Sequence, residues 1–235
     1  MEDTPLFFAG LDVRFMVEIF PRMVQALLVT IQISALALLL GIVLGIPLGG
    51  LRVIGPRPVQ LLIQGLVSYI RGTPQILHFL VVYFALPGVG ILLDEYWTGV
   101  VALTVIAVGY EVEIVRAAIE SVHKGQREAA LAQGMTEPMA FWLILLPQAT
   151  RRMLPALTNE LINVIKASAL LSVIAVNELT KVGNAIIYNT FYFVEVLLEV
   201  AVLYMLVIGA LSWLSKYLEN KVFAFGTALS TPETR

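Results

Sequence analysis

The feature that most constrains this sequence is an uncharged apolar run from Met23 to Leu51. A bilayer core of about 30 Å needs roughly 20 apolar residues per helix, so this run can cross a membrane with residues to spare. The whole chain agrees with it, because 59% of its residues are hydrophobic and only 14% are charged, whereas soluble domains carry about 25% charged residues. The sequence therefore predicts a single all-α integral membrane domain.

Further apolar runs predict four more spans. The stretch from Val59 to Leu93 is too long for one simple span, and Gly72-Thr73-Pro74 interrupts it. Such a break predicts a short amphipathic helix, a kink, and then a spanning helix from about Pro74. The five predicted spans are Met23–Leu51, the helix from about Pro74, Tyr96–Val115, Pro155–Asn177 and Val194–Ser215.

The distribution of Lys and Arg predicts the orientation, since cytoplasmic loops carry an excess of basic residues. With the N-terminus outside, ten basic residues fall inside and three outside. The inside residues are Arg52, Arg57, Arg116, Lys124, Arg127, Arg151, Arg152, Lys216, Lys221 and Arg235, and the outside residues are Arg14, Arg22 and Lys181. We therefore expect an external segment over 1–22, a membrane domain over 23–215, and a cytoplasmic tail over 216–235.

One sizeable polar loop, about 117–152, then lies inside. Its segment Glu128–Gln133 is strongly helix-forming, and Gly134 is suited to end that helix. Thr136 can cap a second short helix that begins near Pro138. The small side chains of Ala129, Ala130 and Ala132 would let a partner's backbone approach closely. The loop therefore predicts a docking element of two short helices.

The spacing of this loop resembles a known signature. Glu128-Ala129-Ala130, then three residues, Gly134, nine residues, and Ile144-x-Leu146-Pro147 is similar to the EAA loop of ABC importer permeases. Several other segments resemble the polar amino acid subfamily, which includes histidine, glutamine and arginine permeases, and together they cover about residues 22–215. They are Tyr69–Pro74, Tyr110 with Glu113 and Arg116, Lys124–Gln126, Leu146–Ala149, and Asn163 with Lys166, Ser168, Leu170 and Ser172–Ile174.

The resemblance implies a type I ABC importer permease fold with five spans in a bacterial cytoplasmic membrane. Glu128 to Gly134 would form a coupling helix that sits in a groove of a cytoplasmic ATP-binding subunit. The chain would work beside a second permease, identical or paralogous, and an external amino-acid-binding protein would deliver the substrate. ATP and Mg²⁺ would bind the partner ATPase, and no cofactor would bind this chain directly.

Intramembrane charges mark the candidate substrate site, because such charges are costly and usually face a cavity or a partner. Asn159, Asn163 and Lys166 follow helical spacing and share a face, with Glu160 on an adjoining one. A zwitterionic amino acid needs a cation for its carboxylate, which Lys166 can supply, and an acceptor for its ammonium, which Glu160 or Glu113 can supply. The alternative is that Lys166 pairs with a glutamate only to hold two helices together.

The depth of Glu113 in the membrane has two interpretations, since Glu113 lies barely one turn from Arg116, which is expected at the inner surface. Either its helix extends past Val115 or Glu113 belongs to a gate. Glu111 cannot share the helix face of Glu113, because two residues correspond to about 200° of rotation. It departs from the family pattern, in which a small or hydroxyl residue is usual, so it would tune specificity or pair between subunits.

Other conspicuous residues have structural interpretations. Gly41, Gly45 and Gly49 repeat every four residues, and this ridge favours close helix packing. Arg71, with Gly72, Thr73 and Pro74, would anchor the kink or gate at the inner surface. His78 is expected to be a hydrogen-bonded packing residue.

Enzyme chemistry is not predicted. The sequence has no GxxxxGK[ST] phosphate loop, so this chain would not itself be the ATPase, and it has no Cys. An ion-coupled secondary amino acid transporter remains the alternative, although such transporters usually show internal repeats and none is detected. The intramembrane acids favour a cationic amino acid, with glutamine, glutamate and opine-like compounds left open.

Overall fold

The structure, a computed structural model, describes residues 10–223, and every regular element among them is helical. The predicted all-helical class is therefore confirmed. The elements are α1 (Val13–Ile54), α2 (Arg57–Gly72), α3 (Gln75–Gly88), α4 (Glu95–Glu120), α5 (Lys124–Ala132), α6 (Glu137–Ala140), the π-helical η1 (Phe141–Leu145), α7 (Leu146–Ser168), the 3₁₀ segment η2 (Ala169–Ile174), α8 (Leu179–Thr190) and α9 (Phe193–Phe223). The beginning of the predicted external segment and the end of the predicted tail lie outside the described residues.

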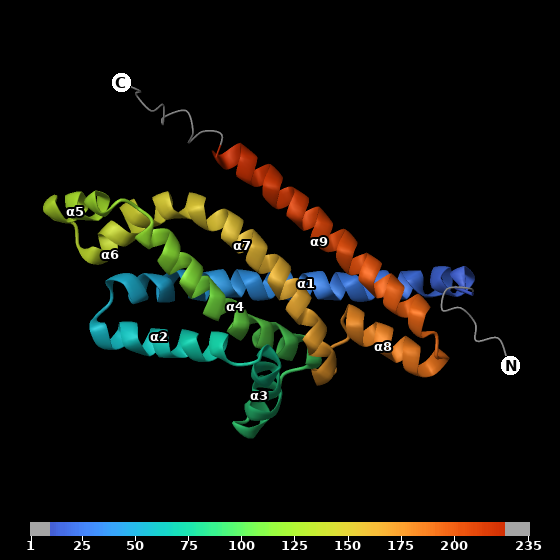
Figure 1. Cartoon of the computed structure of the whole chain (residues 1–235). Helices are drawn as coiled ribbons and strands as arrows, with labels where there is room; N and C mark the ends of the chain where they lie inside the picture. Colours follow the sequence, from blue (N-terminus) through green and yellow to red (C-terminus); the bar gives the residue numbers. More distant parts are fainter. Residues whose placement is uncertain (1–9, 224–235) are drawn as a thin grey trace.

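Helix α1 runs along the length of the molecule, and the other elements pack around it (Figure 1). Its most extensive contact is with α4, and α7 packs on both. Helix α9 packs beside α7 and crosses α1, with α8 beneath it at one end of α1. The short helices α5 and α6 lie at the opposite end (Figure 1). The fold therefore places the predicted docking loop at one end of a helix bundle.

Four helical segments are long and apolar enough to cross a membrane, namely Val13–Ile54, Glu95–Glu120, Glu137–Ile174 and Phe193–Tyr217. Helix α3, which follows the predicted kink, is apolar but has 14 residues, fewer than a simple span needs. The membrane class is thus supported by four spans. The fifth span and the orientation stay predictions.

Two helix boundaries differ from the predicted ones because apolarity alone locates only the middle of a helix. Helix α1 begins at Val13 instead of Met23, where Asp12 Oδ1 accepts a hydrogen bond from the backbone N–H of Phe15 at 3.0 Å and caps the helix. Helix α4 continues past Val115 to Glu120, as one of the two interpretations of Glu113 required.

The predicted start of the fourth span at Pro155 is also displaced. The chain is helical without a loop from Glu137 to Ile174, and Pro155 lies inside α7. Proline lacks the backbone donor that a helix interior uses, and Pro147 directly follows the π-helical turn, where the regular α-helical hydrogen-bond pattern is already interrupted. The second loop helix and the fourth span are therefore parts of one continuous helical segment.

Several local predictions are confirmed. Helix α2 ends at Gly72 and α3 begins at Gln75, so the kink lies at Thr73-Pro74. Gly134 follows α5 with a φ of +85°, a conformation that glycine adopts without strain. Thr136 caps α6, accepting a hydrogen bond from the backbone N–H of Met139 at 3.4 Å.

The glycine ridge of α1 lies against α4, as expected. Gly41, Gly45 and Gly49 are all buried. A β-carbon at Gly49 would lie 2.6 Å from the β-carbon of Val115, and one at Gly45 would lie 2.9 Å from that of Glu111. Contacts under 3.0 Å are essentially never seen for real β-carbons, so the two helices approach as closely as the absence of a side chain allows.

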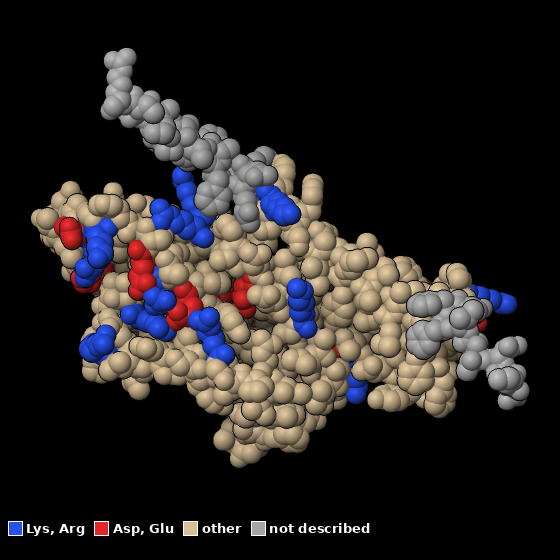
Figure 2. All heavy atoms as spheres, in the orientation of Figure 1, with Lys and Arg blue, Asp and Glu red and all other residues tan. Residues whose placement is uncertain are grey.

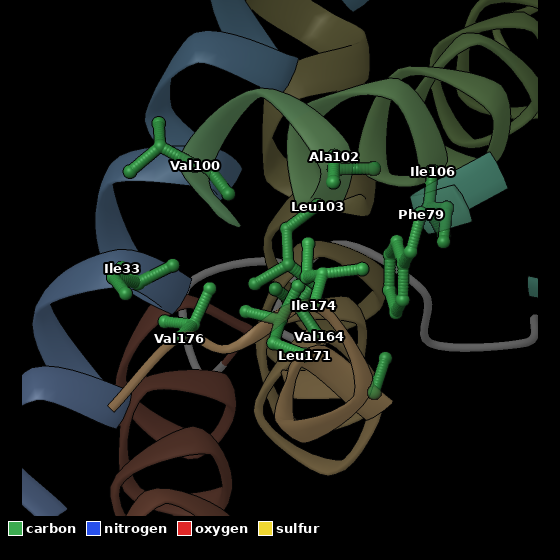
Figure 3. Packing of buried hydrophobic residues seen from close by; sticks show 13 residues of the cluster. Ile33, Phe79, Val100, Ala102, Leu103, Ile106, Val164, Leu171, Ile174 and Val176 are labelled. Carbon is green, nitrogen blue, oxygen red and sulfur yellow. The ribbon is translucent and has the colours of Figure 1, made fainter. Parts of the chain in front are cut away.

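The main apolar core lies where α1, α3, α4 and α7 meet η2. Its buried side chains include Ile33 of α1, Phe79 of α3 and Leu103 of α4, packed around Leu171 of η2 (Figure 3). The core holds α4 and α7 side by side, with the polar faces of both helices turned toward the site described next.

Candidate functional site

Two adjacent cavities lie between α4 and α7, with volumes of about 730 and 520 Å³. Both are lined by Tyr110, Glu160 and Asn163, so they form one polar hollow. The first also contains Arg71, Glu113, Arg116, Arg152 and Asn159, and the second also contains Gln75 and Lys166. Each volume falls in the usual range of small-molecule sites, about 300–1,000 Å³.

Helix α7 supplies the predicted substrate residues to this hollow. Asn159, Asn163 and Lys166 lie on its exposed face, consistent with their spacing, and all three line a cavity. Glu160 is only 4% exposed yet lines both cavities. The Asn163 side-chain amide donates to its carboxylate at 3.4 Å. The arrangement brings a cation, a carboxylate and amides together.

Lys166 is exposed in the second cavity. Among the ion pairs recorded for the described residues, none involves Lys166. In this structure Lys166 shares the cavity with Glu160 and Asn163 and makes no recorded pair with a glutamate, and its role in substrate binding stays a prediction.

Glu113 is the centre of a charge cluster that joins three helices. Its carboxylate pairs with Arg52 of α1, with Arg116 one turn along α4 at 2.9 Å, and with Arg71 of α2 at 3.8 Å. The Arg71 guanidinium also lies 5.3 Å from the ring centroid of Tyr110, a cation–π distance. Three cations around one carboxylate leave this end of the hollow positively charged.

The kink residues stand beside this cluster. Arg71 is in the last turn of α2, and the Thr73 hydroxyl donates to the Tyr69 carbonyl at 2.8 Å. His78 is 3% exposed, with its Nε2 2.8 Å from the Thr73 hydroxyl and 3.1 Å from the Ile70 carbonyl oxygen. The expectation that His78 is a hydrogen-bonded packing residue is confirmed, and it fixes the kink.

Sequence reasoning did not assign Arg52, Gln75 or Arg152 to the site. Arg52 was counted only as an inner-surface charge, and Arg152 lines the first cavity while donating to the backbone carbonyl of Ser121. No local spacing connects these residues to Glu113 or Glu160, because each comes from a different part of the chain. Only the helix packing brings them together.

The predicted docking loop forms an exposed pair of short helices. Glu128 and Ala129 face outward on α5, whereas Ala130 is 5% exposed and packs within the chain. The Arg127 guanidinium Nε donates to Glu137 of α6 at 3.0 Å, which ties the two helices together. Figure 2 shows Lys and Arg side chains gathered toward this end of the molecule, with Asp and Glu side chains among them.

Spanning helices around a hollow lined by both signs of charge, with an exposed helical pair at one end, define a membrane transport subunit. Residues 37–224 match the model of the family described as binding-protein-dependent transport system inner membrane component. The chain belongs to this family. It is a permease subunit of an ABC transporter of the bacterial inner membrane, and ATP hydrolysis is the task of a separate subunit.

Named relatives agree over nearly the full chain. The arginine transport system permease protein ArtQ of Bacillus subtilis is 32% identical over 91% of this chain and 98% of its own length. The glutamine transport system permease protein GlnP of Escherichia coli K12 is 36% identical over 86% of this chain and 93% of its own. These relatives favour the ABC permease interpretation over the ion-coupled transporter.

Solved structures confirm the fold. A chain from the crystal structure of an amino acid ABC transporter with histidines superposes with a TM-score of 0.81, at 32% identity, over 90% of this chain and 99% of that one. A chain of the MetNI methionine ABC transporter gives a TM-score of 0.75 at 23% identity, over 85% and 95%. The type I importer permease fold predicted from the sequence is therefore confirmed.

Proposed function

We propose that this chain carries a polar amino acid across the membrane through the hollow between α4 and α7. The observation that carries the proposal is that Glu160 and Lys166, groups of opposite charge on one helix, line the same cavity. A zwitterion presents an ammonium and a carboxylate on one carbon. Glu160 would accept from the ammonium, Lys166 would bind the carboxylate, and Asn163 and Asn159 would add hydrogen bonds.

The charge cluster at Glu113 would set the inner end of the pathway. Arg71, Arg116 and Arg52 surround its carboxylate, and Gly72-Thr73-Pro74 joins Arg71 to α3. A substrate that leaves the hollow toward this end would meet these cations. Glu160 would suit the side chain of a cationic amino acid such as arginine, lysine or histidine, whereas the Glu113 carboxylate is already paired with three arginines, so glutamine and glutamate also stay candidates.

The coupling loop would connect the hollow to an ATPase. Glu128, Ala129 and the turn at Gly134 would seat α5 in a groove of a cytoplasmic ATP-binding subunit, which holds ATP and Mg²⁺. Ala130, buried beneath them, would support that surface from inside. A second permease, identical or paralogous, and an external binding protein would complete the complex. Residues 1–22 would then be external, 23–215 within the membrane, and 216–235 cytoplasmic.

Purification of the native complex through a tag on this chain tests the proposal. We expect a soluble ATPase to co-purify, and vesicles containing the complex to take up an amino acid only when ATP is on the ATPase side. A panel of arginine, lysine, histidine, glutamine and glutamate, presented with the binding protein, identifies the substrate. Uptake that proceeds without ATP would refute the proposal.

Variants of the hollow test the site itself. We expect Lys166→Ala and Glu160→Gln each to lower uptake by about tenfold or more, the effect of losing one charge-assisted hydrogen bond. Two control variants also remove one positive and one negative charge, but at positions outside the hollow: Lys181→Ala on α8 and Glu18→Gln on α1. Both should leave uptake unchanged. If both hollow variants assemble normally and show wild-type uptake kinetics, the assignment of Lys166 and Glu160 to the substrate site is wrong.

A further inference from the structure

Glu111 is a buried acid that the proposed transport site does not use. Glu111 lies in α4 and is 0% exposed. Both of its carboxylate oxygens are buried without a hydrogen-bond partner. It lines neither of the two cavities. A buried ionisable group with no donor is costly, so its presence calls for an explanation.

The glycine ridge of α1 forms the other wall of the Glu111 site. A β-carbon at Gly41 would lie 2.2 Å from a carboxylate oxygen of Glu111, so the carboxyl group occupies the space that a side chain would fill. A β-carbon at Gly45 would lie 2.9 Å from the Glu111 β-carbon. The wall that α1 presents here is made of glycine and carries no charge to balance a carboxylate.

Glu160, on the neighbouring helix α7, has an electrostatic effect on Glu111. Its charge has the same sign, so it does not compensate an ionised Glu111. Arg71, the cation that acts on Glu160, is recorded in pairs with Glu113 and over Tyr110. Neither the glycine wall nor Glu160 supplies a positive charge to an ionised Glu111, and burying a neutral carboxyl costs much less free energy than burying a charged one.

A metal cation does not fit this site. Such ions need several oxygen ligands at once, and among the side chains that the structure describes, those of residues 10–217, no group of three His, Cys, Asp or Glu could hold one. The space beside the carboxyl at Gly41 is already filled by the carboxyl itself. A proton needs neither additional space nor additional ligands.

We propose that Glu111 is a proton-binding site that fastens α1 to α4. Its carboxyl is protonated while the glycine ridge is packed against it, and loss of the proton is coupled to separation of the two helices. The Glu111 site is distinct from the substrate hollow, and Glu160, which lines the hollow, links the two electrostatically.

Infrared spectroscopy of the purified chain in lipid tests the protonation directly. The wild-type protein at pH 7 should show a stronger carbonyl-stretch band of protonated carboxylic acid than Glu111→Gln, which keeps the contribution of Glu178. Glu18→Gln, which removes an exposed carboxylate from α1, should leave that band intact. An identical protonated-acid band in wild type and Glu111→Gln would overturn the proposal.

Discussion

Gly49 of α1 lies directly against Val115 of α4, and a β-carbon on the glycine would fall 2.6 Å from that of the valine. The valine β-carbon is rigid, since it is held by its own backbone, so the helices themselves would have to move. Gly49→Ala should lower the stability of the chain by about 1–3 kcal/mol, the usual cost of overpacking. The melting temperature in detergent measures it.

Gly65→Ala is the matched control for this prediction. Gly65 lies within α2, is exposed, and a β-carbon there meets nothing within 4 Å. Alanine in a helix interior is favoured over glycine by about 0.5–1 kcal/mol, so this variant should be as stable as the wild type or more so. Equal destabilisation by both substitutions would contradict the packing explanation.

The charge cluster offers a pair of variants that share one arginine. Arg116 contacts both Glu113 and Glu120, whose side chains are 16% and 53% exposed. Glu113→Gln leaves Arg52 and Arg116 without their shared carboxylate and should cost about 1–3 kcal/mol. Glu120→Gln removes a surface charge and should cost less than about 1 kcal/mol. Thermal unfolding at low and high salt measures the loss of stability in both variants. A larger loss in Glu120→Gln than in Glu113→Gln would contradict the central role of Glu113 in the charge cluster.

Glu178, just before α8 and outside the candidate spans, should make stability depend on pH. It is fully buried, and its carboxylate accepts from the backbone N–H of Thr180 and Lys181 at 2.9 and 2.6 Å and from the Tyr204 hydroxyl at 3.1 Å. Burial nevertheless raises the pKa of Glu178 from 4.5 to about 7. The folded chain therefore holds this proton over a range where the unfolded chain has lost it.

The sign of the pH effect follows from that raised pKa. Stability contributed by Glu178 is fully present below pH 4.5 and is lost as pH rises through about 7. The melting temperature of the wild type minus that of Glu178→Gln should thus fall over this window and be flat above it. Glutamine retains one oxygen to cap α8, so the helix start is kept. A difference that rises with pH would contradict the raised pKa.

The docking surface of α5 can be tested by the size of one side chain. Ala129 is exposed, so Ala129→Trp should not disturb the fold but should keep a partner's backbone away. We expect association with the ATPase to weaken by about tenfold or more, equal to about 1.4 kcal/mol, measured by co-purification and titration. Ala129→Ser, a small replacement, is the control. Unchanged association with tryptophan would remove Ala129 from the proposed interface.

Local chemistry made several features of the fold predictable. The helix break at Gly72-Thr73-Pro74 and the cap at Thr136 depend on residues within a few positions of each other, and the structure has both. The glycine ridge was predictable because a four-residue spacing places Gly41, Gly45 and Gly49 on one helix face. These signals do not depend on what the rest of the chain does.

Other features depend on distant residues and could not be predicted this way. Helix α8 was not anticipated, because its stretch Leu179–Thr190 is neither long nor uniformly apolar. The rotation of about 200° between Glu111 and Glu113 predicted that they face different ways. The structure confirms this, because Glu111 lies against α1 and Glu113 lies in the charge cluster. Pairing of Glu111 between subunits was a wrong interpretation, since the side chain is sealed within its own chain.

The unbroken helical segment from Glu137 to Ile174 has a mechanical consequence. Its 38 residues correspond to about 57 Å of helix. We expect load applied at α6 to pass along this segment to Lys166, through the π-helical turn at Phe141–Leu145 and past Pro155, which removes one backbone hydrogen bond from α7. If α5 and α6 dock the ATPase as proposed, their displacement would be passed on to the hollow, because no loop lies between α6 and Lys166 to absorb it.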